Sequence, residues 1–389
     1  MKVLIIVALY SILYIYTLLQ LNHWLKPLSK SIIPRILADL IFIALGIMPV
    51  CAAFLGEGSL RNILETNGNI WFGFLIYFVG CLFIFHIFRF FAWILNHNNP
   101  NKAKVAPWIG VTVLGVCLLV SMSLNVIGHV NSHKVRTSHY SITSSKKTTS
   151  SGKVKIVLIS DLQLGANTHV GQLRAMVREI NQQNADAVFV AGNTFSSYFS
   201  SLKNPSLYTE ILKEIKAKQG VYAVFGDTDV EQPLFAGFTL MPNTPNTNRD
   251  EMTKYMSDCG FQLLDDITIY INGVQIVGRR NDSHTNKKRA AISSLTGSLD
   301  THMPIFVLQS KPEDFKNLQV CGVDVSFSGH TRNGQYFPIN LINRLLYENS
   351  YGLKTIHNVY TVVTSGVGTS GAPIRVGTRS EIAVIDFQY

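Results

Sequence analysis

The sequence has 389 residues, which is enough for two structural units because a single domain usually contains about 100–200 residues. Its net charge of +10 is shared equally between the parts before and after residue 129, and no dense basic stripe with interleaved aromatic residues is present. This distribution argues against nucleic-acid binding. The five cysteines show no CxxC spacing, so neither a disulfide framework nor a zinc motif is predicted.

Four apolar stretches near the N-terminus are long enough to cross a bilayer, which takes about 20 residues. They are Val3–Leu21, Ile36–Leu55, Ile70–Leu95 and Val105–Ile127. The first stretch has no small-x-small cleavage site, which favours an uncleaved anchor over a signal peptide. We therefore predict a four-span transmembrane domain over residues 1–129, with the lipid bilayer as its partner. Lysines and arginines are divided too evenly to predict on which side of the membrane the remainder lies.

Residues 130–152 are rich in Ser, Thr and Lys, which predicts either a flexible linker or a hairpin with an edge strand at His139–Thr143. Strands and helices then alternate over residues 153–389. The apolar runs Val154–Ile159, Ala187–Val190 and Gly220–Phe225 are each followed by Gly or Asp within two residues. Strands of this kind place polar groups along one edge of a sheet, where α/β proteins bind their ligands. Shorter strands near the C-terminus fit a second sheet packed on the first.

Five short motifs follow the predicted strands. In chain order they are Asp161-Leu162-Gln163, Gly192-Asn193, Gly226-Asp227-Thr228-Asp229, Ser310-Lys311-Pro312 and Gly329-His330-Thr331-Arg332. Their order and spacing, together with the Thr364–Arg375 segment, resemble the calcineurin-like metallophosphoesterase family in its bacterial membrane-anchored branch. The resemblance covers roughly residues 137–389. It implies an α/β fold, a two-sheet sandwich flanked by helices, for residues 153–389.

The resemblance also implies which residues would form the site. In this family two divalent ions, of Mn, Fe or Zn, clamp a phosphate and activate a bridging water. The ligand positions correspond to Asp161, Gln163, Asn193, Asp227, Lys311, His330 and Arg332, and the general-acid position corresponds to Thr228. Of these, Asp161 and His330 carry the residue that is usual in the family, and a threonine cannot act as a general acid near neutral pH. We therefore expect no bound cofactor and impaired catalysis.

The substitutions have an electrostatic pattern. Two dications are exchanged for two cationic side chains, Lys311 and Arg332, which we expect to face the carboxylates of Asp161, Asp227 and Asp229. Carboxylates gathered without a counter-charge would repel one another, and the two cations would neutralise them. An Arg–Lys pair in a polar pocket also suits a phosphate group. A retained anion-binding pocket and a site that has drifted under no functional constraint are the two interpretations.

Three functional hypotheses follow from the sequence. The first is a multi-pass protein of the bacterial plasma membrane with a pseudo-phosphoesterase domain that binds an anionic or phosphate-bearing ligand. The second is an active phosphohydrolase with a single metal held by Asp161, Asp227 and His330, acting on a phosphate ester or a lipid-linked phosphate. The third is a domain that merely caps a functional four-helix membrane unit. Another histidine, such as His169 or His284, could also replace a lost ligand.

Overall fold

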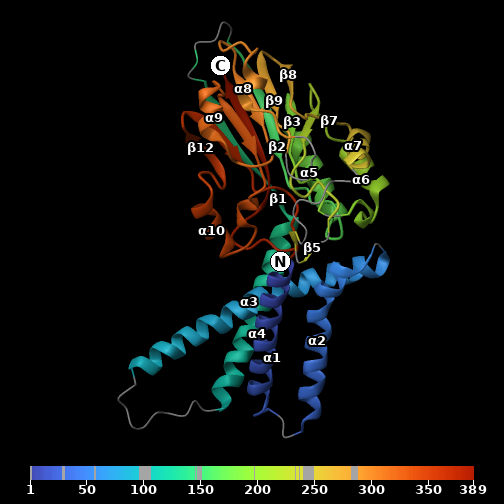
Figure 1. Ribbon diagram of the computed structural model, residues 1–389, viewed down its shortest axis with the longest axis vertical. Coiled ribbons are helices and arrows are strands. Elements are labelled where there is room, and N and C mark those ends of the chain that lie inside the picture. The colour runs from blue at the N-terminus through green and yellow to red at the C-terminus, as the bar shows by residue number, and fades with distance from the viewer. Residues whose placement is uncertain are drawn as a thin grey trace. The chain divides into compact units, whose positions relative to one another are not determined.

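The chain folds into two compact units, which are drawn in Figure 1. The computed structural model describes residues 2–389 apart from residues 29–30, 57, 96–106, 145, 147–150, 197, 233, 236, 240–248 and 282–287. The first unit contains residues 1–128 and the short segments 234–240 and 371–373. The second unit contains residues 129–233, 241–370 and 374–389.

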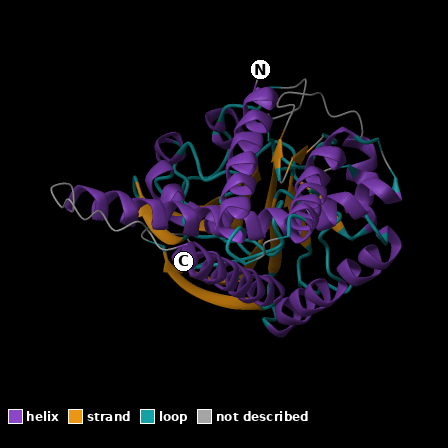
Figure 2. Cartoon of the chain, turned by 90° about the horizontal axis from the view of Figure 1, so that it is seen from below, coloured by secondary structure: helices purple, strands orange, loops and turns teal. Residues whose placement is uncertain are grey.

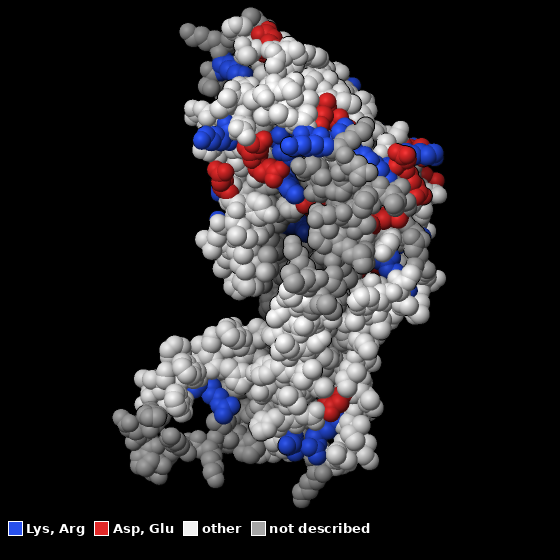
Figure 3. Space-filling view, viewed as in Figure 1, with Lys and Arg blue, Asp and Glu red and all other residues white. Residues whose placement is uncertain are grey.

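The first unit is made mainly of apolar helices. They are α1 (Lys2–Leu25), α2 (Ile33–Phe54), α3 (Ser59–Leu95) and α4 (Pro107–His133). Among the described residues, three helices are long and apolar enough to cross a membrane, namely α2, α3 and Trp108–His133 within α4. The remaining predicted stretch, Val3–Leu21, is helical within α1, and the count of four spans stays a prediction. The surface of this unit shows few charged side chains (Figure 3).

Close packing within the helical unit depends on small residues. A Cβ atom on Gly68 would lie 2.8 Å from the backbone nitrogen of Pro49, so α3 can approach α2 this closely only with glycine at this position. A short hairpin formed by β5 (Leu234–Phe235) and β6 (Phe238–Thr239) belongs to the same unit. The ring of Phe235 meets that of Tyr10 edge-on, with 5.1 Å between the centroids. A segment from the second half of the chain therefore completes the packing of these helices.

The second unit contains two six-stranded sheets. In the first sheet the strand order is β1-β14-β2-β3-β4-β7, and every neighbouring pair is parallel except β14 with β2. In the second sheet the order is β12-β13-β11-β10-β9-β8, with parallel central pairs and an antiparallel pair at each edge. The strands of the first sheet are β1 (Val135–Thr143), β2 (Lys153–Ile159), β3 (Ala187–Ala191), β4 (Val221–Val224), β7 (Phe261–Leu263) and β14 (Ser380–Gln388). Those of the second are β8 (Ile267–Ile271), β9 (Val274–Gly278), β10 (Ile305–Leu308), β11 (Val325–Ser328), β12 (Gly352–Ile356) and β13 (Val359–Val363).

The two sheets pack face to face through an apolar core. Phe189 of the first sheet meets Phe327 of the second with 5.3 Å between the ring centroids, and Phe306 meets Phe387 at 4.8 Å. Helices cover the outer faces of the sheets (Figure 2). On the first sheet they are α5 (Val170–Gln182), α6 (Pro205–Lys213) and α7 (Arg249–Asp258), and on the second they are α8 (Ile292–Thr296) and α9 (Phe315–Val320). The predicted two-sheet α/β sandwich is confirmed.

The connection between helices and sandwich differs from both sequence interpretations. Residues around His139–Thr143 do form an edge strand, β1, but β14 lies between β1 and β2, so these two strands are not a paired hairpin. Pairing with β14 is possible because the C-terminal strand is long enough to match β1 over its full length. Only Lys134 separates the end of α4 from the start of β1. A long flexible linker is therefore not present at this point, and residues 145 and 147–150 lie outside the described part of the chain.

Candidate phosphoesterase-type site

The predicted motifs lie in loops that follow the C-terminal ends of five strands, β2, β3, β4, β10 and β11. The backbone in these loops is unusual, because several non-glycine residues have positive φ. The values are 50° at Asp161, 51° at Gln163, 56° at Asn193, 68° at His330 and 49° at Arg332. Left-handed backbone is unfavourable for residues with a Cβ atom. Such positions persist where the surrounding structure enforces them, and they cluster at functional sites.

Asp161 is the buried centre of the site, with a side chain that is 0% exposed. Its Oδ1 accepts a hydrogen bond from Asn193 Nδ2 at 2.9 Å. Its Oδ2 accepts two more, from Ser160 Oγ at 2.7 Å and from the backbone N–H of His330 at 2.9 Å. The guanidinium Nη1 of Arg332 lies 3.9 Å from Oδ1. The carboxylate is thus held by protein donors and faces a protein cation.

Asp227 forms the second charged pair. Its Oδ2 lies 2.9 Å from Lys311 Nζ and 3.9 Å from His330 Nδ1, and its Oδ1 accepts a hydrogen bond from Asn281 Nδ2 at 2.9 Å. Burial alone would raise the pKa of Asp227, but the neighbouring His330 and Lys311 and the hydrogen bonds from Lys311 and Asn281 outweigh it and lower that pKa to about 2. Burial lowers the pKa of His330. The carboxylate therefore remains ionised beside an ammonium.

Gln163 and Thr228 contact each other across the site. The amide Nε2 of Gln163 donates to Thr228 Oγ1 at 3.1 Å. The Thr228 hydroxyl donates to the carbonyl of Phe195 at 2.7 Å, and its backbone N–H donates to Asn193 Oδ1 at 3.1 Å. The hydroxyl proton is therefore committed to a main-chain carbonyl. In this geometry Thr228 joins the loops that follow β2, β3 and β4.

The expectation that Asp229 faces the two cations is wrong. Asp229 is buried, and its two carboxylate oxygens accept hydrogen bonds from the backbone N–H groups of Phe195 and Gly226, both at 2.7 Å. Burial raises the pKa of Asp229 to about 7, against the effect of these donors. The side chain satisfies loop donors that would otherwise be buried without a partner. It therefore joins the loops after β3 and β4 instead of contributing to the charge balance with Lys311 and Arg332.

Sequence reasoning missed the role of Arg375, which is 0% exposed. Its Nη2 donates to the carbonyls of Ser365, Gly366 and Gly368 at 2.9, 3.0 and 2.7 Å. The Gly368 N–H in turn donates to the Asp161 carbonyl at 2.7 Å. Burial lowers the pKa of Arg375 to about 10, so it is charged at neutral pH. The only feature of the sequence that could have indicated this role is the position of a single arginine at the end of a glycine-rich segment.

The side chains at the ligand positions do not fit a pair of divalent ions. Metal ligands must present lone pairs, whereas Lys311 and Arg332 present N–H groups, and the amide nitrogen of Asn193 is directed at Asp161. Within the described part of the chain, no group of three or more His, Cys, Asp or Glu side chains is arranged to hold a metal ion. The carboxylates of Asp161 and Asp227 face the cationic side chains of Arg332 and Lys311 instead.

The other histidines considered as substitutes have other neighbours. The ring of His169 lies 4.1 Å from that of His133 and 6.0 Å from that of His129, measured between centroids. His284 lies outside the described residues.

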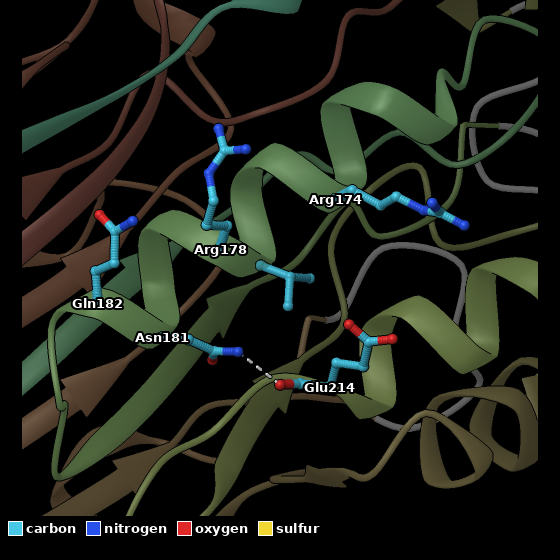
Figure 4. Close-up of a pocket in the computed structure, with 6 residues that line it drawn as sticks. Arg174, Arg178, Asn181, Gln182 and Glu214 are labelled. Carbon is cyan, nitrogen blue, oxygen red and sulfur yellow. Dashed lines mark hydrogen bonds between the residues drawn. The ribbon is translucent and has the colours of Figure 1, made fainter.

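A separate pocket lies on the outer helices of the sandwich (Figure 4). It is lined by residues of α5, among them Arg174, Arg178 and Asn181, and by Glu214, which follows α6. Asn181 Nδ2 donates to the Glu214 carbonyl at 2.8 Å across it. None of its lining residues belongs to the five motifs, so this pocket is not the candidate site.

Comparison with known proteins agrees with this geometry. Residues 154–333 match the family described as calcineurin-like phosphoesterase. An uncharacterized metallophosphoesterase of Aquifex aeolicus is 24% identical over 276 residues, which cover 69% of this chain and 97% of that protein. A transmembrane protein with metallophosphoesterase domain from Danio rerio is 26% identical over 320 residues, covering 78% of this chain and 69% of the relative. An uncharacterized metallophosphoesterase of Helicobacter pylori is 25% identical over 238 residues, with 60% of this chain and 59% of the relative covered.

These matches and the two-sheet sandwich define the class of protein. Residues 154–333 form a domain of the calcineurin-like phosphoesterase type, and the relatives that align with the chain are named for a metallophosphoesterase domain. Members of this family typically use divalent metals, and relatives of this chain include proteins named as transmembrane.

The contact between Lys311 and Asp227 predicts a loss of stability when the ammonium is removed. Lys311→Met keeps the aliphatic stem and leaves a mostly buried carboxylate without its cation, so we expect a loss of about 1–3 kcal/mol, seen as a lower melting temperature by calorimetry in detergent. The matched control is Lys254→Met, because Lys254 and Asp258 form a salt bridge with side chains that are 78% and 53% exposed. That change should have little effect. Equal melting of both variants would contradict a buried pair.

The low pKa of Asp227 predicts that the free energy of unfolding decreases at acidic pH. Since the folded-state pKa of about 2 lies below the usual 3.8, the stabilisation is complete above pH 3.8 and is lost as the pH falls towards 2. When it is complete, this stabilisation adds about 2 kcal/mol to the free energy of unfolding. We expect the melting temperature of the wild type to fall more between pH 5 and pH 2.5 than that of Lys311→Met. A parallel fall in the two proteins would place the acid-sensitive group elsewhere.

Proposed function

We propose that this protein is a membrane-anchored pseudo-phosphoesterase whose sandwich domain binds an anionic or phosphate-bearing ligand without a divalent metal. The observation that carries the proposal is the position of Lys311 Nζ, 2.9 Å from Asp227 Oδ2, because the family resemblance implies a metal ligand at this position. Together with Arg332 near Asp161, it supplies two positive charges against two carboxylates. The site is then electrically balanced without an ion.

Buried donor groups of the site that make no hydrogen bond within the described structure support ligand binding. Arg332 Nη1 and Ser310 Oγ are buried, and within the described structure neither makes a hydrogen bond. A phosphate group offers several acceptor oxygens to such donors, and arginine binds it with favourable geometry. A buried donor without a partner is costly, so a bound anion would recover this energy. These two groups are the ones we expect to contact the ligand directly.

The backbone of the site supports a maintained function over drift. A site under no constraint could gain stability by placing glycine or asparagine at left-handed positions, which cost about 1–2 kcal/mol for other residues. Gln163, His330 and Arg332 instead keep positive φ. These three residue types are therefore better explained by a functional role at the site than by drift of the sequence without constraint.

The alternative of a working hydrolase with one metal at Asp161, Asp227 and His330 has weaker support. Both oxygens of Asp161 already accept hydrogen bonds from protein groups, and Asp227 is paired with an ammonium. Leaving-group protonation would also need another residue, because the hydroxyl of Thr228 donates to Phe195. We place the protein in the bacterial plasma membrane as a multi-pass protein, supported by its three apolar helices and its bacterial relatives.

Metal content is the first test. We expect the purified full-length protein to hold less than a stoichiometric amount of Mn, Fe or Zn after dialysis, measured by elemental analysis. The comparison variant carries Gln163→His, Asn193→Asp, Lys311→His and Arg332→His, which restores ligand types on an unchanged backbone and should take up metal. One or more tightly held ions per wild-type chain would favour the single-metal hydrolase instead.

Anion binding is the second test. Inorganic phosphate titrated into the detergent-solubilised protein should give saturable heat by calorimetry, and Arg332→Gln should weaken the binding at least about tenfold, the effect of losing one charge-assisted contact. Lys254→Gln, which changes a charge in the exposed salt bridge with Asp258, should bind phosphate like the wild type. Absence of saturable binding to the wild type would support drift of the site.

A further inference from the structure

The helix that follows the fifth motif has its apolar side chains on the outside. This helix, α10, runs from Ile339 to Leu346 and contains eight residues. Leu341, Ile342, Leu345 and Leu346 are 46%, 45%, 87% and 71% exposed, whereas the polar Asn340 is buried. The four apolar residues have the spacing of a single helical stripe. The surface over α10 is white in the space-filling view (Figure 3).

This arrangement is the reverse of that in a helix on a water-soluble domain, where the apolar stripe faces the core and polar residues face solvent. Phe337 and Ile339, just before and at the start of the helix, add further exposed apolar surface, at 50% and 37%. A contiguous apolar patch of this kind marks a surface that binds another apolar phase or protein.

The polar side of α10 fixes the helix to the candidate site. Asn343 Nδ2 donates to the Thr331 carbonyl at 2.9 Å. A Cβ atom on Gly334, where φ is +74°, would lie 2.3 Å from the Asn340 backbone nitrogen, so the loop and the helix start are in close contact. The outward direction of the leucines is therefore set by the polar contacts on the opposite side.

We propose that α10 is an interfacial helix whose apolar stripe inserts into the lipid bilayer in which this chain is anchored. An eight-residue helix is about 12 Å long, and its stripe is too small for a stable protein interface, which needs about 800 Å² per partner. An interfacial helix buries its apolar face about 5–10 Å into the boundary between headgroups and acyl chains, and its binding grows with the apolar area buried there. Arg344 is exposed among them, and a guanidinium at this depth can pair with lipid phosphates. Three helices of the same chain are able to hold the domain at a membrane.

The test is photo-crosslinking of the full-length protein in lipid nanodiscs made of phosphatidylethanolamine and phosphatidylglycerol. A benzophenone amino acid replaces Leu345, which is 87% exposed, or, as the matched control, Val320 at the end of α9, which is 77% exposed. Because both side chains are largely exposed, neither replacement should disturb folding. After irradiation and proteolysis, mass spectrometry identifies the partner of each residue.

We expect lipid adducts at position 345 that are at least about five times more abundant than those at position 320, because the apolar face of an interfacial helix lies in the lipid. Adducts of position 345 with the helices of the same chain, or with a second copy, would overturn the proposal in favour of a protein partner. Equal and low yields at both positions would overturn it in favour of a water-exposed helix. The readout needs no ligand at the candidate site, so it is independent of the proposed function.

Discussion

Neutralising the buried carboxylate of Asp161 is the constraint on which the site depends. The side chain has no contact with solvent, and an ionised group in such a place needs both hydrogen bonds and a counter-charge. The structure meets the first need from three separate elements, through Ser160, Asn193 and the backbone of His330. Arg332 meets the second. Because these donors come from the ends of strands in both sheets, fixing one carboxylate also fixes the relative position of the sheets.

Charge balance explains why the scaffold can keep its shape with so many ligand positions altered. In a two-metal centre, dications hold the loops together by binding their side chains. In this chain the same loops are joined by neutral and charged contacts, including Gln163 with Thr228, Lys311 with Asp227 and Asp229 with two backbone groups. The guanidinium of Arg375 holds the loop behind Asp161 through its carbonyls. Under the proposed function, these contacts hold the loops together in place of metal ions.

The sequence predicted the sandwich well because its signals are local. Runs such as Val154–Ile159 can be read as buried strands from β-branched residues alone. The pairing of β1 with β14 could not be read, because it joins residues more than 200 positions apart. The direction of Asp229 and the contacts of Arg375 were also hidden, since each depends on backbone groups of distant loops. For α10, a stripe of leucines predicts an amphipathic helix but not which face is outward.

A single residue, Lys134, joins α4 to β1. Lys134 provides about 3.5 Å of extended chain, which is small beside the size of a domain. If α4 lies in a bilayer, the covalently attached sandwich diffuses laterally together with that helix. If the proposed ligand is confined to the same membrane, the relevant quantity is the number of ligand molecules per unit area of membrane rather than their concentration in solution. A low intrinsic affinity would suffice for a ligand confined to the same surface.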